Sequence, residues 1–508
     1  MGQNRSPKSE GSSTGLSYLA KHPAALIPAF FIFLAARNWP VFLLADLRDG
    51  FYMKTAVVSD GFSLPGIKFY IKYHMLRPWN GHFIPLWFVV FFGLSYFFDS
   101  NPWAEGFLSF GFAAILLYLI FRIVYHFFNQ RPNGYLYSLM VALVFSSTGF
   151  FLEMIAWKWM TGLLMSSVFF CLALIILLEK NLTLKWQIVY TLALFSSFWT
   201  FGSAWVQAWG LLLFLFLSGR KWNERIVVLT AIIAFIGTAL SIIANHNSIP
   251  ALNPLFLITN LPAIFALAAT NVLLLTVGVF RFGGLQEIYV SSVLGVTIIM
   301  ALSFHFYSRY KEGRGLSKID ALVVSLLLTF LATIVLSLLR LTPANGITPT
   351  SSPENYIIGG RYLFVYSIPL ILALAIALGK RIAGLPRNLL YIFMLGALAY
   401  GVIIQATYRR VDPDISNTQR TEFYNLTLKA LQAAEAKHLP LPELSGGLFV
   451  RGYEVNLSEA AKVRKDAYKY HPVFKDPHEI SASECFSLQQ DPTISRWLNL
   501  YNKNWCDK

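Results

Sequence analysis

Runs of about 20 apolar residues recur through most of this chain, from Pro23 to Tyr408. An α-helix of that length crosses the hydrocarbon core of a bilayer, whereas a water-soluble chain would interrupt such runs with charge. Of the 508 residues, 56% are hydrophobic and only 13% are charged. The mean hydropathy is +0.54. The pattern predicts an all-α polytopic membrane protein.

Short basic loops set the predicted orientation, because Lys and Arg are retained on the cytoplasmic side of a membrane. We place the loops 122–131, 180–185, 220–225, 309–318 and 380–387 on that side. About eleven crossings follow, with the N-terminus inside and the C-terminal tail outside. The predicted spans are 23–45, 103–125, 135–151, 160–178, 186–203, 207–217, 226–244, 290–306, 319–339, 363–378 and 388–407.

Two further apolar segments are predicted not to cross. Segment 262–280 is assigned to a re-entrant or outer-surface helix, because the chain needs an odd number of crossings between residue 244, outside, and the inner loop 309–318. Segment 83–98 lacks a basic inner flank, so we place it along the outer surface, after an amphipathic interfacial stretch around 67–77.

These boundaries divide the chain into three parts. Residues 1–22 form a predicted disordered cytoplasmic tail, 23–407 the transmembrane domain with a first outer loop at 46–101, and 408–508 a small extracytoplasmic domain. Of the three cysteines, Cys171 lies in an apolar run, and Cys485 with Cys506 is predicted to form a disulfide in an oxidising compartment. The net charge of +15 is attributed to topology and anionic lipid, not to nucleic acid.

Asp46 and Asp49 follow directly on the first span. Carboxylates at the outer mouth of a membrane cavity suit a general base for an acceptor hydroxyl, or a cation site. The alternative is that they are solvated loop residues. Nearby, Arg77, Trp79, Asn80 and His82 stand beside a turn. Asn and His can hold sugar hydroxyls and Trp can stack on a sugar face, while anchoring at the membrane interface is the competing interpretation.

Three further residues are candidates at the outer face. Glu153 follows the third span beside two tryptophans, where a solvated rim is the alternative to sugar binding. Arg361, followed by Tyr362, opens the span 363–378 after two glycines, and its planar fork suits bidentate binding of a phosphate. Arg37, inside the first apolar run, is a second phosphate candidate unless it snorkels to the interface.

The order of these features resembles the GT-C superfamily of integral membrane glycosyltransferases, which use polyprenyl-phosphate-linked sugars. The likeness rests on Asp46 and Asp49 after the first span, Arg122 at the end of the next, and Arg361 with Tyr362 opening a late span. The run from Trp79 to Pro85 is similar to a motif of bacterial members of uncertain substrate. Many members have adjacent acids, whereas Leu47 and Arg48 separate these two.

The resemblance implies a transferase of the bacterial inner membrane. It implies that the acid of the first outer loop, Asp49 or Asp46, is the base and that the late Arg361 holds the donor phosphate. From their own chemistry we add Tyr362 and Arg77 as candidates for the phosphate, and His82, Asn80, Trp79 and Glu153 as candidates for the sugar or acceptor. The donor would be a polyprenyl-phosphate sugar, the acceptor a glycan or lipid, and the transfer inverting. No metal-ligand spacing is present, so use of a divalent metal stays open.

Three other functions remain open. An O-antigen polymerase or ligase would carry its large outer loop between late spans, whereas here the large outer regions are 46–101 and the tail. A lipid or solute transporter would show inverted repeats and buried charges, and we predict that the spans lack a buried acid. A purely structural scaffold is the third.

Overall fold

The computed structural model describes residues 23–38, 84–98, 102–148, 151, 154–155, 160–201, 204–218, 223–244, 300, 307, 311, 317–344, 360–411, 426, 429–430, 433–434, 436–442, 448–450, 453–455, 474–475 and 480–501. Within α16, α17 and α18, the side chains of 334–344, 360–366 and 404–411 are not described.

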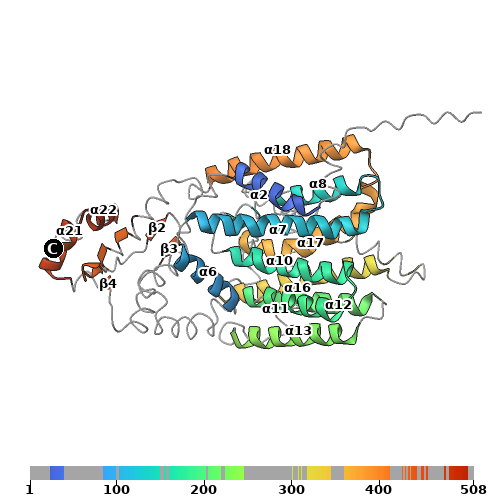
Figure 1. Ribbon diagram of the computed structural model, residues 1–508, viewed down its shortest axis with the longest axis horizontal. Coiled ribbons are helices and arrows are strands. Elements are labelled where there is room, and N and C mark those ends of the chain that lie inside the picture. The colour runs from blue at the N-terminus through green and yellow to red at the C-terminus, as the bar shows by residue number, and fades with distance from the viewer. Residues whose placement is uncertain are drawn as a thin grey trace, which may run out of the picture.

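The membrane part of the described chain is a bundle of helices (Figure 1). They are α2 (Leu26–Arg37), α6 (Pro85–Phe97), α7 (Pro102–Phe128), α8 (Gly134–Ser146), α10 (Thr161–Glu179), α11 (Leu184–Thr200), α12 (Trp205–Leu217), α13 (Glu224–Ala244), α16 (Lys318–Ala344), α17 (Gly360–Ile382) and α18 (Arg387–Val411), with the short 3-10 helix η1 (Pro23–Ala25) before α2. Every predicted span except 290–306 contains one of these helices. Span 290–306 lies outside the described residues save for Met300, as does the whole of 262–280.

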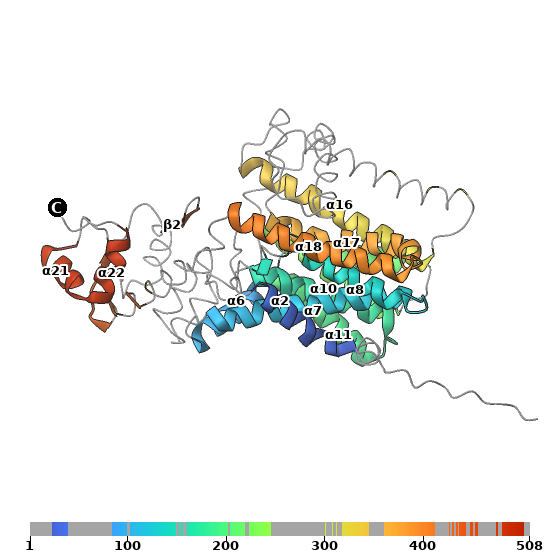
Figure 2. The ribbon, with the colours of Figure 1, turned by 90° about the horizontal axis from the view of Figure 1, so that it is seen from above.

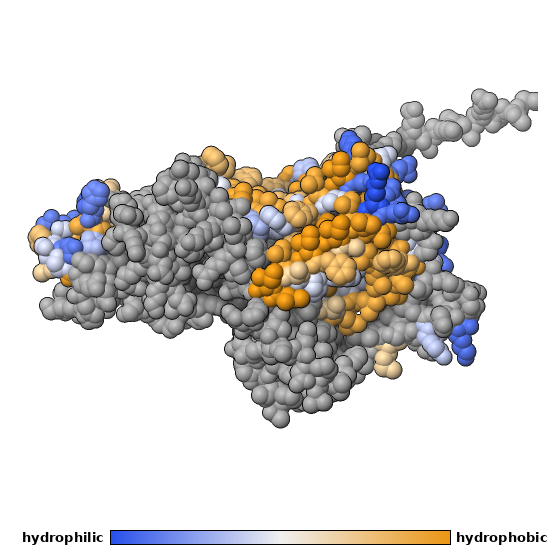
Figure 3. All heavy atoms as spheres, turned by 90° about the horizontal axis from the view of Figure 1, so that it is seen from below, coloured by the Kyte–Doolittle hydropathy of each residue, from blue (hydrophilic) through white to orange (hydrophobic). Residues whose placement is uncertain are grey.

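Their composition makes this a helical membrane protein. In the part of the chain that the structure describes, three helices are long and apolar enough to cross a bilayer: Trp103–Phe128, Thr161–Glu179 and Glu224–Ile243. Shorter apolar helices accompany them. Apolar side chains form a band on one face of the molecule, with hydrophilic side chains gathered at one end of the band (Figure 3). A bilayer is the solvent that such a band requires.

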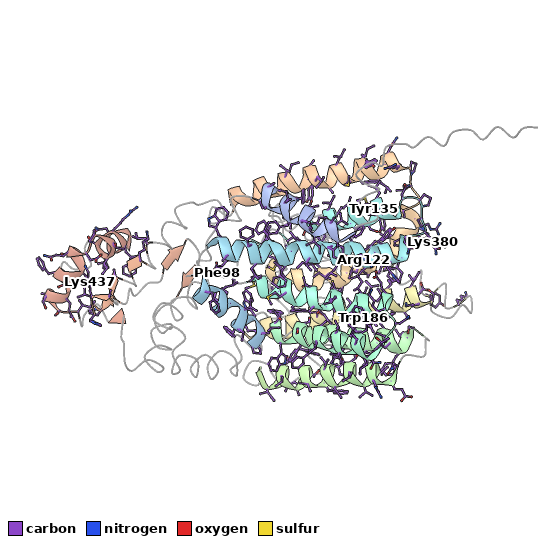
Figure 4. The ribbon with its side chains drawn as sticks, in the orientation of Figure 1. Phe98, Arg122, Tyr135, Trp186, Lys380 and Lys437 are labelled. Atoms are coloured by element: carbon purple, nitrogen blue, oxygen red, sulfur yellow. The ribbon has the colours of Figure 1, made fainter. Side chains whose placement is uncertain are left out.

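The basic loops meet at one end of the bundle, which we call the basic end and define by Arg122, Lys180, Lys185, Lys318 and Lys380. Figure 4 shows Arg122 and Lys380 toward that end, with Phe98 at the other. The ammonium groups of Lys180 and Lys185 lie 5.0 and 5.8 Å from the Trp186 ring centre. Side chains and loops from distant parts of the sequence therefore converge there, as the positive-inside pattern predicts.

The opposite end, which we call the distal end, is where α2 and α8 finish and α7, α10 and α17 begin. Phe31 of α2 stacks on Phe107 of α7 at 5.6 Å between ring centres, and Arg37 reaches Ser147 at the end of α8. The helices thus alternate in direction along the chain. Helix α13 ends at the distal end, whereas α16 begins beside His126 at the basic end. Helices α13 and α16 therefore run in the same direction.

Helix α6 departs in part from its predicted position. It does not reverse the direction of the chain, since α2 ends and α7 begins at the distal end. Its aromatic face is buried on the bundle instead of lying along an outer surface: Trp87, Phe88 and Phe91 are 3%, 0% and 1% exposed. They pack with Met165 of α10. Aromatic rings bury more area against neighbouring helices than at an interface, which explains the insertion.

The centre of the bundle is α10. Of its most apolar 18 residues, 89% are buried, against 28% for α13. Helix α13 therefore lies at the edge, and Figure 2 shows α16, α17 and α18 layered over α8, α10 and α7. A helix that is apolar all round belongs in the middle of a membrane bundle, because every face meets protein.

The described C-terminal residues lie beyond the distal end and form a small unit of their own (Figures 1 and 2). Helices α21 (Ala482–Gln490) and α22 (Pro492–Tyr501) pack with helical residues near Ala430 around Trp497, which is 1% exposed. The described C-terminal residues also include two two-stranded sheets. In one, β1 (Leu441–Pro442) pairs with β4 (Phe474–Lys475), and in the other, β2 (Leu448–Val450) pairs with β3 (Tyr453–Val455). Cys485 is disulfide-bonded and Cys171 is a free, buried thiol, which leaves Cys506, outside the described residues, as the remaining cysteine of the sequence.

Candidate functional site

Most of the predicted site falls outside the described residues. Those residues are Asp46, Asp49, Arg77, Trp79, Asn80, His82 and Glu153. Arg361 and Tyr362 belong to the first turn of α17, where the backbone is described and the side chains are not. The described elements that carry or flank these residues are α2, α6, α8 and α17.

The two elements that flank the predicted site, the end of α2 and the start of α17, lie at the same end of the bundle. Helix α17 begins at the distal end, since its last turn carries Lys380 at the basic end. Helix α2 finishes at the distal end with Asn38 as its C-cap. Asp46 is eight residues beyond Asn38 in the sequence. The start of the first outer loop and the backbone of Arg361 thus share one end of the bundle.

The Trp79 to Pro85 motif runs into a buried anchor. Ile84 is 5% exposed and precedes α6, whose Trp87 lies against Gly162 at the start of α10. A Cβ on Gly162 would stand 2.9 Å from Cγ of Trp87, closer than carbon atoms pack. Only a glycine admits the indole here, so this contact fixes the position of α6 next to the motif.

The chain on either side of Glu153 is also held in the bundle. Phe151, Met154 and Ile155 are each 0% exposed. The Phe151 amide donates to Oγ1 of Thr148, 3.4 Å away, and Thr148 caps the end of α8 by donating to the Phe145 carbonyl. Phe151, Met154 and Ile155 therefore belong to the buried core of the bundle.

Glu105 corrects the prediction that the spans lack a buried acid. It lies in the first turn of α7 at the distal end and is only 4% exposed. Ser109, one helical turn on and on the same face, is 0% exposed, and its hydroxyl has no hydrogen-bond partner among the described residues. An acid at the start of a long apolar run, followed by serine at i+4, is a signal that the sequence did carry. A carboxylate near the helix N-terminus is also favoured by the helix dipole.

The other buried acid of the described spans has a structural role. Asp320 is 6% exposed in the first turn of α16. Its carboxylate accepts from the Ser317 amide at 3.1 Å and from the Ser317 hydroxyl at 2.6 Å. The Ser317 hydroxyl in turn accepts from the Asp320 amide at 3.2 Å. These bonds cap the helix at the basic end, far from the predicted site.

Arg37 occupies a seam between three helices at the distal end. Its Nη1 donates to Oγ of Ser147 on α8 at 3.2 Å, and its guanidinium lies 5.8 Å from the Phe33 ring centre. A Cβ on Gly401 of α18 would stand 2.3 Å from Nη2 of Arg37. The side chain is thus directed across the bundle at α8 and α18 instead of snorkelling along its own helix.

Comparison with protein-family models, with curated proteins and with solved structures finds no match for this chain. Among the described residues, no three His, Cys, Asp or Glu side chains are grouped as metal ligands would be. The described residues of the distal end supply a buried carboxylate on α7, a guanidinium from α2, and hydroxyls from α7 and α8.

Proposed function

We propose that this chain is a GT-C-like glycosyltransferase with about eleven membrane crossings, which moves a sugar from a polyprenyl-phosphate donor to a glycan or lipid acceptor. The basic end faces the cytoplasm and the distal end faces the periplasm or cell exterior of a bacterial inner membrane. What supports this is the convergence at the distal end of the end of α2, eight residues before Asp46, and the beginning of α17, which carries Arg361.

The proposed reaction needs a base and a phosphate-binding cation on one side of the membrane. Asp49 or Asp46 takes the proton of the acceptor hydroxyl, and the oxygen attacks the anomeric carbon with inversion. The bond from that carbon to the phosphate oxygen breaks, and its electron pair leaves with the polyprenyl phosphate. Arg361, with Tyr362 and Arg77, stabilises the charge that develops on this phosphate. Trp79, Asn80, His82 and Glu153 hold the sugar or acceptor.

Sugar transfer in membranes tests the assignment. Asp46→Asn and Asp49→Asn keep the side-chain shape but cannot accept the proton, so the catalytic one should lose turnover while polyprenyl-phosphate binding is kept. Arg361→Lys keeps the charge but loses the planar fork, and should weaken donor binding by about 1.5 to 3 kcal/mol. Assays with and without a chelator decide whether the acids hold a divalent cation. Transfer at the parent rate by the double Asp variant would refute the mechanism.

A lipid or solute transporter is the second candidate, and Glu105 favours it. Buried acids inside membrane helices are rare and mark ion or substrate pathways. Glu105 lies in the first helical turn of α7, at the distal end of the bundle. Proton-driven uptake into vesicles that Glu105→Gln abolishes, without sugar transfer by the parent, would favour the transporter.

A further inference from the structure

Two lysines are gathered around one indole ring at the basic end. Lys180 directly follows α10 and Lys185 lies in the first turn of α11, and their ammonium groups lie 5.0 and 5.8 Å from the Trp186 ring centre. Both lysine side chains are exposed. Figure 4 shows Trp186 toward the same end of the bundle as Arg122 and Lys380. Like charges held around one ring repel each other, so an anion bound beside the ring stabilises both.

The described part of the protein does not neutralise these two charges. Among the described residues, no carboxylate forms an ion pair with Lys180 or Lys185. Glu179, the neighbour of Lys180 in the sequence, is paired with Arg122 of α7 instead. Both ammonium groups therefore remain available to an anionic ligand.

The connection that carries Lys180 is held by the two helices that it joins. The Lys180 amide donates to the Ile176 carbonyl at 3.1 Å, which continues the hydrogen bonding of α10. Nε2 of Gln187, a side chain of α11 that is only 5% exposed, donates to the Leu182 carbonyl at 2.8 Å. The backbone that places the lysines is thus set before a ligand arrives, which lowers the entropic cost of binding it.

The lysines stand at the head of a surface that faces lipid. Leu184, Ile188 and Leu192 follow one another at four-residue intervals along α11 and are 63%, 51% and 58% exposed. We call these three side chains the apolar stripe. Ile188 and Leu192 also follow Lys185 by three and seven residues, the spacing of one helix face. In a bilayer the apolar stripe meets acyl chains, so a ligand of the two lysines is next to hydrocarbon.

We propose that Lys180, Lys185 and Trp186 form the headgroup site of one anionic phospholipid of the cytoplasmic leaflet, whose acyl chain lies along the apolar stripe of α11. The two ammonium groups bind the phosphate, because basic positions between the cytoplasmic ends of membrane helices attract anionic headgroups. Trp186 packs on the bundle core and places its indole at the level of the headgroups. The site needs the basic end to face the cytoplasmic leaflet and does not depend on sugar transfer.

Two pairs of substitutions separate this site from a general attraction of anionic lipid to the basic end. Lys180→Gln with Lys185→Gln removes two charges from the proposed site. Lys380→Gln with Arg387→Gln removes two charges from the same end of the bundle, at the last turn of α17 and the start of α18. A diffuse attraction weakens equally in both pairs, whereas a site on α10 and α11 weakens in the first pair alone.

Binding is measured by native mass spectrometry of the purified full chain in detergent, with phosphatidylglycerol and phosphatidylcholine as separate probes. The parent and the Lys380/Arg387 pair should bind one phosphatidylglycerol at least about tenfold more tightly than phosphatidylcholine. The Lys180/Lys185 pair should lose that preference, and Trp186→Phe should keep part of it. Thermal unfolding without added lipid should be the same in the parent and both charge pairs, because all four residues lie at the surface.

A crosslinking experiment places the lipid. Phosphatidylglycerol with a diazirine on its acyl chain, in nanodiscs of phosphatidylcholine, should label residues 184–192, and unlabelled phosphatidylglycerol should suppress the label. Equal weakening in the two charge pairs, equal affinity of the parent for both lipids, or labelling only of other helices would overturn the proposal. Displacement of the lipid by inorganic phosphate would also overturn it, because the site would then bind a small anion without its acyl chain.

Discussion

Arg122, near the end of α7, and Glu179, the last residue of α10, form an ion pair between two helices that run in the same direction. Their side chains are 26% and 15% exposed. At the basic end, the pair fixes how far α7 and α10 are shifted relative to each other along their axes. Parallel neighbours have no short loop to set their register, so a side-chain contact has to do so.

The ion pair predicts a non-additive response to mutation. Glu179→Met or Arg122→Met alone should lower the free energy of unfolding by about 1 to 3 kcal/mol, because a charge is left without its partner in a partly buried place. Replacing both residues by Met should restore much of the loss. Thermal unfolding of the purified protein in detergent measures all four corners of the cycle. Additive single effects would contradict the pairing.

The hydroxyl of Tyr137 donates to the Ala375 carbonyl at 2.6 Å and links α8 to α17 inside the bundle. Tyr137→Phe should therefore destabilise the protein by about 1 kcal/mol. The neighbouring Tyr135 is the control, since its buried hydroxyl has no hydrogen-bond partner among the described residues. Tyr135→Phe should leave the unfolding midpoint unchanged or raise it. Equal losses in the two variants would count against the Tyr137 bond.

Helices α12 and α16 approach closely at Gly210. A Cβ there would stand 1.9 Å from Oγ1 of Thr329, which donates to the Ser325 carbonyl at 2.7 Å. Gly210→Ala should cost about 1 to 3 kcal/mol through overpacking, and adding Thr329→Ala should recover part of it. Gly111→Ala, where a Cβ meets nothing within 4 Å, should be neutral or stabilising. Midpoints of thermal unfolding that do not differ would refute the close contact.

Asp491 predicts a pH dependence for the C-terminal unit. The side-chain hydrogen bond from Lys437, 2.7 Å away in the ion pair, and amide bonds from Ile494 and Thr493 hold the pKa of Asp491 below its usual 3.8. A carboxyl whose pKa is lower in the folded state stabilises that state above its unfolded pKa, and the contribution is lost as pH falls through the folded value. Protection of α22 should thus be constant near neutrality and fall below about pH 4.

Hydrogen exchange of the α22 amides, corrected for intrinsic rates, measures this loss. Asp491→Asn keeps an oxygen that can accept the two amide bonds but removes the titrating carboxylate, so it should flatten the acid dependence of the protection. Lys437→Met removes the largest cause of the lowered pKa, so it should move the transition toward higher pH. An acid profile that is identical in all three proteins would show that another group governs it.

Topology is testable through the last crossing. A reporter fused after Gly384, at the basic end, should lie in the cytoplasm, and one fused at Lys508 should lie outside. Helix α18 runs between them from the basic end to the distal end. Activity of both reporters on one side of the membrane would overturn the orientation of the proposed site.

The sequence alone predicted the helical membrane class and the places of the described helices, and it predicts their orientation. Apolar runs give the membrane class because backbone groups in lipid must be satisfied within a helix, and basic loops give the direction because Lys and Arg stay on one side. The burial of segment 83–98 at Trp87 and the burial of Glu105 were misjudged, since neither periodicity nor loop charge reports which neighbours a residue meets.

Only the tertiary structure decided which side chains meet. Arg37, Ser147 and Gly401 are far apart in the sequence, and nothing in their local patterns relates them. In a helix whose every face is apolar, hydropathy cannot distinguish a face against lipid from a face against protein. The approach of α18 to α8 distinguishes them: at Gly401 it leaves room for a guanidinium, and at the adjacent Val402 and Ile403 it leaves the side chains to the lipid.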